Sequence, residues 1–125
     1  MTGKTVIILA AILGAISVGI GAFGAHGLES TLNANNRVDT FETAVKYQFY
    51  HTIALFLLGI LMLNYDQSQF NVAAICFIVG IFIFSGSLYT LSLTNITWLG
   101  AITPIGGLAF IVGWAFIALG ASKAL

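Results

Sequence analysis

Four long apolar stretches, separated by short polar segments, make up most of this 125-residue chain. Each is close to the roughly 20 residues that a helix needs to cross the hydrocarbon core of a membrane. Backbone groups inside lipid must bond within their own segment, so the stretches are predicted to be helices. The pattern therefore predicts an all-α fold, an integral membrane bundle of four transmembrane helices in a single domain over residues 1–125. The predicted spans cover residues 5–25, 44–63, 70–91 and 101–121.

Composition supports a lipid environment and excludes several classes of protein. Hydrophobic residues make up 59% of the chain and charged residues only 6%, whereas a soluble domain has about 25% charged residues. The formal net charge is zero, so nothing in the sequence suggests a nucleic-acid partner. The single cysteine, Cys76, lies within an apolar stretch, which excludes a disulfide framework. The lipid bilayer is the partner that composition predicts.

Four spans place most of the uncharged polar side chains in one half of the membrane. We call the face on which the chain begins side A and the opposite face side B. The first and third spans then end on side B, where the second and fourth begin. The polar side chains near these four ends form a candidate cluster of His26, Gln48, His51, Ser85, Ser87, Tyr89 and Thr103.

The two histidines are expected to lie close together at the side-B rim of this cluster. His26 closes the first span, and His51 lies shortly inside the side-B end of the second. Consecutive helices are usually neighbours, and Gln48 precedes His51 by three residues, within reach of a hydrogen bond. Each imidazole is therefore predicted to bond to neighbouring helices, with no bound metal.

The longest predicted connection covers residues 26–40. Asp39, followed three residues later by Glu42, fits a capping box, so the second helix is expected to begin near Asp39, before the chain enters lipid. Glu42 and Lys46 have the spacing of an i,i+4 ion pair on the first turns of that helix.

Glycines recur at helical spacing in the first and fourth spans. Small residues let helix backbones approach closely in lipid, where packing drives association. The stripes are therefore predicted to pack the bundle internally, with the alternative that one of them also faces a second copy in a homo-oligomer. The candidate packing residues are Gly14, Gly21 and Gly24 in the first span and Gly106, Gly113 and Gly120 in the fourth.

Several short motifs resemble a known family. The segments "GAFGAHGL", "YQFYH", "FSGSLY" and "ITPIGG", followed by Trp114, occur in this order along almost the whole chain. They resemble the small membrane proteins classified as domain of unknown function 423, which are similar to eukaryotic transmembrane protein 256. The resemblance implies a four-span integral membrane protein, and it implies no reaction.

Three interpretations of the polar cluster remain open. In the first, its side chains bond one another and hold the helices together, as intramembrane polar groups usually do. In the second, they line a small polar pocket or pathway open to side B, because ionisable residues within a membrane are functional candidates. In the third, His26 and His51 ligate a metal or haem, although no third strong ligand is near. A cavity that reaches His51 would favour the second interpretation, and a fully packed cluster the first.

No motif indicates catalysis. The sequence has no Gly-x-Ser-x-Gly motif, and its acidic residues fall in connections or at helix ends, at Glu29, Asp39, Glu42 and Asp66. We therefore expect a protein that is not an enzyme, has no cofactor and plays a structural or homeostatic role, in membrane integrity or the support of membrane assemblies. The alternative is a carrier or binding protein for a lipid, a proton or a small polar ligand at one membrane face.

Positive charges give little information on orientation. Lys4 and Lys123 flank side A, and Arg37 and Lys46 flank side B, so the positive-inside comparison is a tie. Because Lys4 and Lys123 lie close to span ends, we expect both termini in the cytoplasm and the protein in a bacterial plasma membrane.

Overall fold

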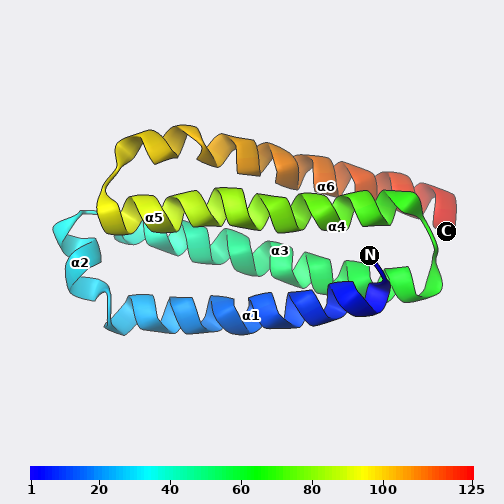
Figure 1. Cartoon of the computed structure of the whole chain (residues 1–125), viewed down its shortest axis with the longest axis horizontal. Helices are drawn as coiled ribbons and strands as arrows, with labels where there is room; N and C mark the ends of the chain where they lie inside the picture. The colour runs from blue at the N-terminus through cyan, green and yellow to red at the C-terminus, as the bar shows by residue number, and fades with distance from the viewer.

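The computed structural model describes residues 1–125 and contains only helices. Helix α1 and the short α2 are followed by the long α3; the third span joins α4, the π-helix η1 and α5, and the fourth joins the 3-10 helix η2 and α6 (Figure 1). Four of these units are long and apolar enough to cross a membrane, which confirms the predicted fold class. Their bounds are α1 Gly3–His26, α2 Glu29–Ala34, α3 Val38–Asn64, α4 Ser68–Gly80, η1 Ile81–Ser85, α5 Gly86–Thr94, η2 Thr97–Ala101 and α6 Thr103–Ala124.

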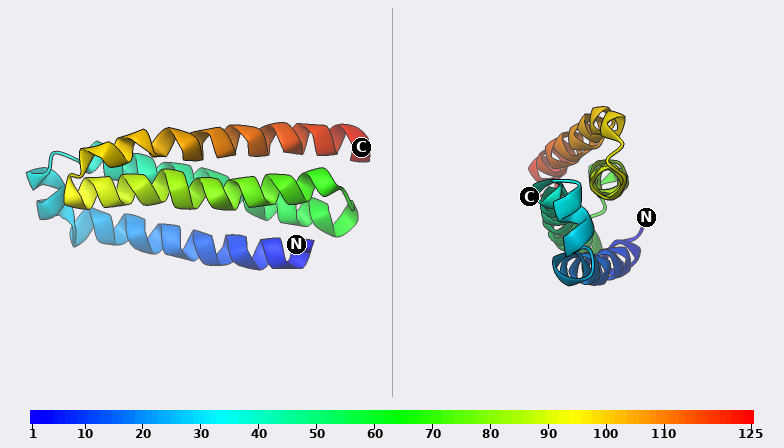
Figure 2. Two further views of the ribbon diagram at one scale, coloured as in Figure 1. Left: turned by 45° about the horizontal axis from the view of Figure 1, so that its top comes forward. Right: turned by 90° about the vertical axis from the view of Figure 1, so that its left-hand side faces the viewer.

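The four spans lie side by side and run antiparallel in chain order. Both termini and the α3–α4 turn lie at one end, side A, while α2 and the α5–η2 turn lie at the other, side B (Figure 1). Helix α3 and the third span occupy the middle, with α1 packed on α3 and α6 packed on α4 (Figure 2). In the most apolar stretch of each span, 17% and 22% of the residues are buried in the two outer spans, against 39% in each central span. Helices α1 and α6 therefore present broad faces to lipid.

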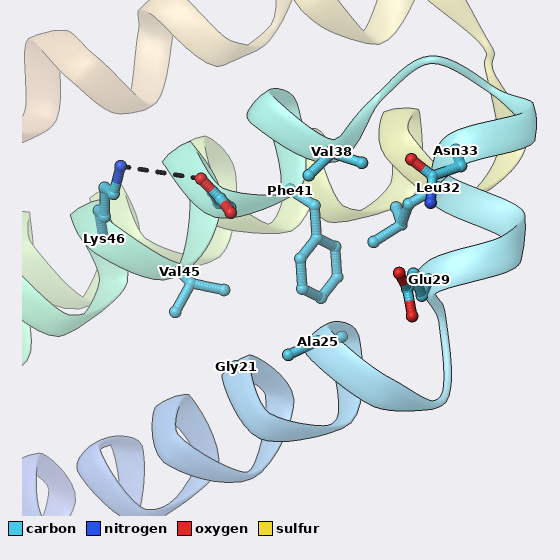
Figure 3. Close-up of a pocket in the computed structure, with 11 residues that line it drawn as sticks. Gly21, Ala25, Glu29, Leu32, Asn33, Val38, Phe41, Val45 and Lys46 are labelled. Atoms are coloured by element: carbon cyan, nitrogen blue, oxygen red, sulfur yellow. Dashed lines mark ion pairs between the residues drawn. The ribbon is translucent and has the colours of Figure 1, made fainter.

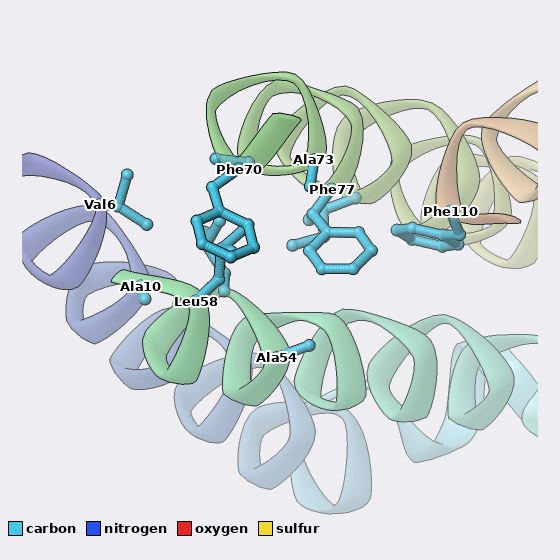
Figure 4. Packing of buried hydrophobic residues seen from close by; sticks show 11 residues of the cluster. Val6, Ala10, Ala54, Leu58, Phe70, Ala73, Phe77 and Phe110 are labelled. Atoms are coloured by element: carbon cyan, nitrogen blue, oxygen red, sulfur yellow. The ribbon is translucent and has the colours of Figure 1, made fainter. Parts of the chain in front are cut away.

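The apolar core fills the side-A half of the bundle and reaches its middle. Phe70 and Phe77 from α4 project between the helices toward Leu58 and Ala54 of α3 (Figure 4). All four are buried, and Phe77 is fully so. Lipid chains are as apolar as these rings, so the rings stabilise the bundle through close packing and not through removal from water. The side-A half therefore has close apolar packing, and most side-chain hydrogen bonds between the spans lie at the middle or in the other half.

The glycines of α1 pack against α3, as predicted. A Cβ atom added at Gly14 would lie 3.5 Å from Thr52 Cγ2, and one at Gly21 would lie 3.3 Å from Val45 Cγ1. A Cβ at Gly24 would overlap the ring of Phe41. Glycine at these positions lets the two helices approach within ordinary contact distance.

The glycines of α6 each face a phenylalanine of the third span. Gly120 faces Phe70 and Gly113 faces Phe77, where an added Cβ would lie 2.6 Å from Phe77 Cε1. Gly106 lies against the backbone of Phe84, and Gly80 of the third span faces the ring of Phe110 of α6. Both glycine stripes thus pack against other helices inside the chain, as predicted, and the alternative that one of them also faces a second copy stays a prediction.

Two local elements differ from the sequence-based prediction. The connection over residues 26–40 contains α2, of which only Leu32 is buried, and its six residues are too few to show a helical period. Helix α3 begins at Val38 after Arg37, with no side-chain cap, so the predicted capping box at Asp39 is wrong. Asp39 instead lies in the first turn, where a negative charge favours the helix dipole.

The π-helix η1 was not predicted. Its wider turn inserts an extra residue into the third span, and such turns often occur at functional sites. Neighbouring residues in it contact different helices: Ser85 Oγ donates to the Ala44 carbonyl of α3, while Phe84 lies against Gly106 of α6. The third span can therefore contact both neighbours at the level where the side-B half begins.

Candidate functional site

Gln48 links three of the four spans. Its side chain is buried, and its Nε2 donates to the Leu13 carbonyl of α1 over 3.3 Å. Its Oε1 accepts a hydrogen bond of 2.6 Å from the Tyr89 hydroxyl of α5. Both ends of the amide therefore have partners, as a buried polar group in lipid requires. This contact brings together two residues of the predicted cluster.

The hydroxyls of the cluster form separate interhelical contacts. Ser87 Oγ and Thr103 Oγ1 lie 2.7 Å apart and join α5 to α6. Ser85 Oγ donates over 2.8 Å to the Ala44 carbonyl and joins η1 to α3. The predicted side-B residues thus form several distinct pairs, and no single connected network.

His51 lies at the middle of its helix, because α3 extends further toward side B than the predicted span. Of the 27 residues of α3, thirteen precede His51 and thirteen follow it, so the side chain sits at the helix midpoint. Its Nδ1 lies 2.8 Å from the Tyr47 carbonyl, and its Nε2 lies 3.2 Å from Trp114 Nε1. A carbonyl only accepts and an indole N–H only donates, so this arrangement requires a neutral ring with its proton on Nδ1.

Aromatic rings enclose the imidazole of His51. The Phe110 ring is parallel to it, with centroids 3.5 Å apart, and the edge-on Phe77 ring has its centroid at 5.3 Å. His51 is consequently buried and, through Trp114, bonded to α6. The expectation of bonds to neighbouring groups is met, but the predicted partner Gln48 is wrong, because its amide points to α1 and α5.

His26 stands apart from the rest of the cluster. It is the exposed last residue of α1, and its side chain makes no hydrogen bond. Near this end α1 contacts α3 at Phe41, ten residues and about 15 Å along the helix from His51. The prediction that the two histidines lie close together is therefore wrong. The third interpretation required both histidines at one metal or haem, and this geometry removes its basis.

A groove reaches His51 from the lipid-facing side, between α3, η1 and α6. It has a volume of about 630 Å³. Its lining combines aromatic rings with the small residues of the first turns of α6. The residues that line it are Tyr47, His51, Phe84, Pro104, Gly107, Leu108, Phe110, Ile111 and Trp114.

A second pocket lies at the side-B end, enclosed by α1, α2 and the start of α3 (Figure 3). It has a volume of about 400 Å³, with Phe41 and Leu32 among its apolar lining residues and charged residues at its edge. The charged residues are Glu29 of α2 with Glu42 and Lys46 of α3; the Lys46 Nζ lies 4.0 Å from Glu42 Oε2, and both side chains are largely exposed. We call this cavity the side-B pocket.

A shallow groove along α1 and α3 adjoins the side-B pocket on the side of the membrane interior. The two share Gly21, Val45 and Lys46, and the groove extends to Phe49 and Tyr50 over a further volume of about 250 Å³. None of the predicted cluster residues lines either part. The signal available in the sequence was the Glu42–Lys46 spacing.

The fold and these contacts define a class of protein: a four-span integral membrane protein with most of its interhelical polar contacts at or on the side-B side of its midpoint. Comparison with known proteins also indicates a membrane protein. The family described as "Protein of unknown function (DUF423)" matches residues 20–107. The UPF0382 membrane protein SH2409 of Staphylococcus haemolyticus is 46% identical over 96% of this chain and 97% of its own length.

Similar proteins also occur in other bacteria. The UPF0382 membrane protein YwdK of Bacillus subtilis is 44% identical, covering 98% of this chain and 99% of the relative. The UPF0382 inner membrane protein YgdD of Escherichia coli is 38% identical, covering 98% and 93%. The chain therefore belongs to the DUF423, or UPF0382, family of membrane proteins, which confirms the resemblance seen in its motifs. No solved structure matches it.

Proposed function

We propose that this protein binds a phospholipid-like amphiphile at the side-B pocket and catalyses no reaction. The observation that carries the proposal is that the charged pocket adjoins an apolar groove along α1 and α3, with three lining residues in common. This corresponds to the alternative derived from the sequence, a binding protein with a polar pocket at one membrane face. The residues that form the pocket, however, differ from those that were predicted.

The depth of the pocket suits a lipid headgroup. With the midpoint of α3 at the bilayer centre, a hydrocarbon core of about 30 Å extends about ten residues to either side of His51. Glu42 is nine residues from His51 and therefore lies at the boundary, with Phe49 and Tyr50 below it in hydrocarbon. A headgroup at Glu42 would place its acyl chain in the groove.

The charges favour a zwitterionic headgroup with a protonated amine. Lys46 pairs with Glu42, and Glu29 has no ion-pair partner, so the pocket has one uncompensated negative charge. An ammonium group near Glu29 would neutralise that charge, and the adjacent phosphate would lie toward Lys46. Phosphatidylethanolamine has both groups in this order, and its ammonium can donate charge-assisted hydrogen bonds to carboxylates.

Local chemistry supports a role without catalysis. The Ser85, Ser87 and Thr103 hydroxyls bond to backbone carbonyls or to each other. None bonds to a histidine or carboxylate that would act as a base, which is the arrangement that activates a nucleophile.

Native mass spectrometry of the protein released from mixed phosphatidylethanolamine and phosphatidylglycerol micelles tests this proposal. We expect preferential retention of phosphatidylethanolamine and about a tenfold loss of that preference in Glu29→Gln, which removes the uncompensated charge. Asp39→Asn is the matched control, because Asp39 lies on the same membrane face but outside the pocket. Equal retention of both lipids, or equal behaviour of Glu29→Gln and Asp39→Asn, would contradict the proposal.

A structural role is the second candidate, and the Gln48 contact favours it. One buried amide links α1, α3 and α5, as expected for a protein whose task is to hold a fixed arrangement in the bilayer. The lipid experiment separates the two candidates: a protein that retains no phosphatidylethanolamine but remains folded would favour the structural role.

We also propose that both termini face the cytoplasm, supported by Lys4 and Lys123 close to the ends of their spans. In a Cys76→Ala background, Ser30→Cys and Thr97→Cys are expected to react with an impermeant maleimide in intact cells. Ser68→Cys is expected to react only after permeabilisation, because it lies at the opposite end of the bundle.

The two parts of this prediction fail in different ways. Labelling of positions 30 and 97 from opposite faces would overturn the four-span topology. If position 68 labels in intact cells and positions 30 and 97 label only after permeabilisation, the orientation alone is overturned.

A further inference from the structure

The groove that reaches His51 has the size and lining of a small-molecule site, and it is separate from the side-B pocket. Its volume of about 630 Å³ falls within the roughly 300–1,000 Å³ typical of ligand pockets. Such sites are mostly apolar with a few placed polar groups. The rim residues Leu108, Ile111 and Trp114 are 60%, 66% and 50% exposed, so the groove opens to the lipid that surrounds α6.

One hydroxyl in this groove lacks a partner. Trp114 Nε1 donates to His51 Nε2, and His51 Nδ1 pairs with the Tyr47 carbonyl. The Tyr47 hydroxyl is therefore the one donor in the groove that has no partner. Tyr47 precedes His51 by one helical turn, about 6 Å from the helix midpoint and therefore within hydrocarbon. Its ring is fixed against Phe84, with centroids 4.6 Å apart. Tyr47 is 40% exposed, and an unpaired hydroxyl in hydrocarbon is unfavourable, so an acceptor from outside the chain would stabilise this donor.

The walls of the groove indicate the shape of the molecule that supplies the acceptor. Phe84, Phe110 and Trp114 present aromatic rings on the α6 side and at η1. Aromatic side chains favour flat rings in offset-stacked or edge-on contact. Gly107 keeps the groove open, since it has no side chain and its nearest neighbour, Phe84 Cδ2, would lie 3.7 Å from an added Cβ.

We infer that the groove binds a lipid-soluble molecule with a flat ring and a carbonyl oxygen, the chemical class of the quinones. The ring lies among Phe84, Phe110 and Trp114, and the carbonyl accepts a hydrogen bond from the Tyr47 hydroxyl. The apolar tail leaves the groove between Leu108 and Ile111 into lipid. The site takes part in binding only, and its occupant differs from the amphiphile at the side-B pocket in lacking a charged headgroup.

Tryptophan fluorescence in nanodiscs, with decylubiquinone as the probe, tests this inference. Trp98→Phe leaves Trp114 as the only tryptophan, and we expect saturable quenching of its emission. In Trp114→Phe the remaining Trp98 lies outside the groove and should show only the linear quenching caused by quinone dissolved in the bilayer. Tyr47→Phe in the Trp98→Phe background should raise the half-saturating concentration about tenfold, through loss of the hydrogen bond.

A matched pair of glycine variants locates the site. Gly107→Leu fills the groove without a steric clash at Cβ and should abolish saturable quenching, whereas Gly19→Leu, which has nothing within 4 Å, should leave it unchanged. If the quenching of Trp114 is linear, or if saturable quenching survives Gly107→Leu, the groove does not bind the quinone. Acyl chains of the surrounding lipid would then occupy it. An unchanged half-saturating concentration in Tyr47→Phe would overturn the carbonyl contact. Retained helix content by circular dichroism establishes that each variant is folded.

Discussion

Replacing Gly113 with leucine is expected to lower the melting temperature of the purified protein by about 5 °C or more. An added Cβ would lie 2.6 Å from Phe77 Cε1 and 3.3 Å from Cys76 Cβ, and Phe77 is fully buried. Overpacking a core typically costs about 1–3 kcal/mol, which exceeds the gain of up to about 1 kcal/mol from a better helix former. The reaction of Cys76 with a thiol-sensitive fluorophore during heating would measure the loss, because unfolding exposes this single cysteine.

Gly19→Leu is the matched control for this experiment. It makes the same exchange in a membrane span, but nothing lies within 4 Å of its added Cβ. It should therefore melt at or slightly above the temperature of the unchanged protein. If Gly113→Leu and Gly19→Leu melt together, α4 and α6 do not approach as closely as the Gly113–Phe77 contact requires.

Hydropathy located the four spans but not the ends of their helices. The predicted second span began at residue 44, whereas α3 begins at Val38 and keeps its helical hydrogen bonds through the polar segment that precedes lipid. Hydropathy reports which residues suit hydrocarbon, and a helix can continue into the headgroup region with polar side chains. The spacing of Asp39 and Glu42 placed the helix start near Asp39, within one residue of Val38, so the helix start followed from local charge and not from hydropathy.

The pairing of the polar residues was less predictable than their depth. Counting residues along four spans placed Gln48 and Tyr89, and also Ser87 and Thr103, at similar levels, and the structure pairs them accordingly. The rotation of a helix is read from an amphipathic stripe, and helices surrounded by lipid show little of one. The direction in which His51 points was therefore undetermined.

The side-B pocket depends on an element that has no sequence signature. Helix α2 is tied to the end of α5 by Asn35 Nδ2, which donates to the Ser92 and Leu93 carbonyls. Arg37 Nε adds a hydrogen bond of 2.9 Å to Asn95 Oδ1. These contacts join residues 57 or more positions apart. Only the tertiary structure shows that they hold a short helix over the end of α1.

His51→Phe is expected to lower the free energy of unfolding by about 1–2 kcal/mol. Phenylalanine preserves the ring that stacks on Phe110, so the change removes only the two nitrogen contacts. An interhelical hydrogen bond in a membrane averages about 0.6 kcal/mol. The larger effect arises because Trp114 Nε1 loses its acceptor where no water replaces it, and an unpaired buried donor costs about 1–3 kcal/mol. Reversible unfolding in mixed detergent micelles measures the difference.

His26→Phe provides the comparison, because its exposed side chain makes no hydrogen bond and the change should stay within about 0.5 kcal/mol. The double variant His51→Phe with Trp114→Phe tests the contact itself. Trp114→Phe removes the orphaned donor, so the double variant should lose less than the sum of the two single variants. Strictly additive losses, or equal losses from the two histidine variants, would show that the His51–Trp114 hydrogen bond does not hold α3 to α6.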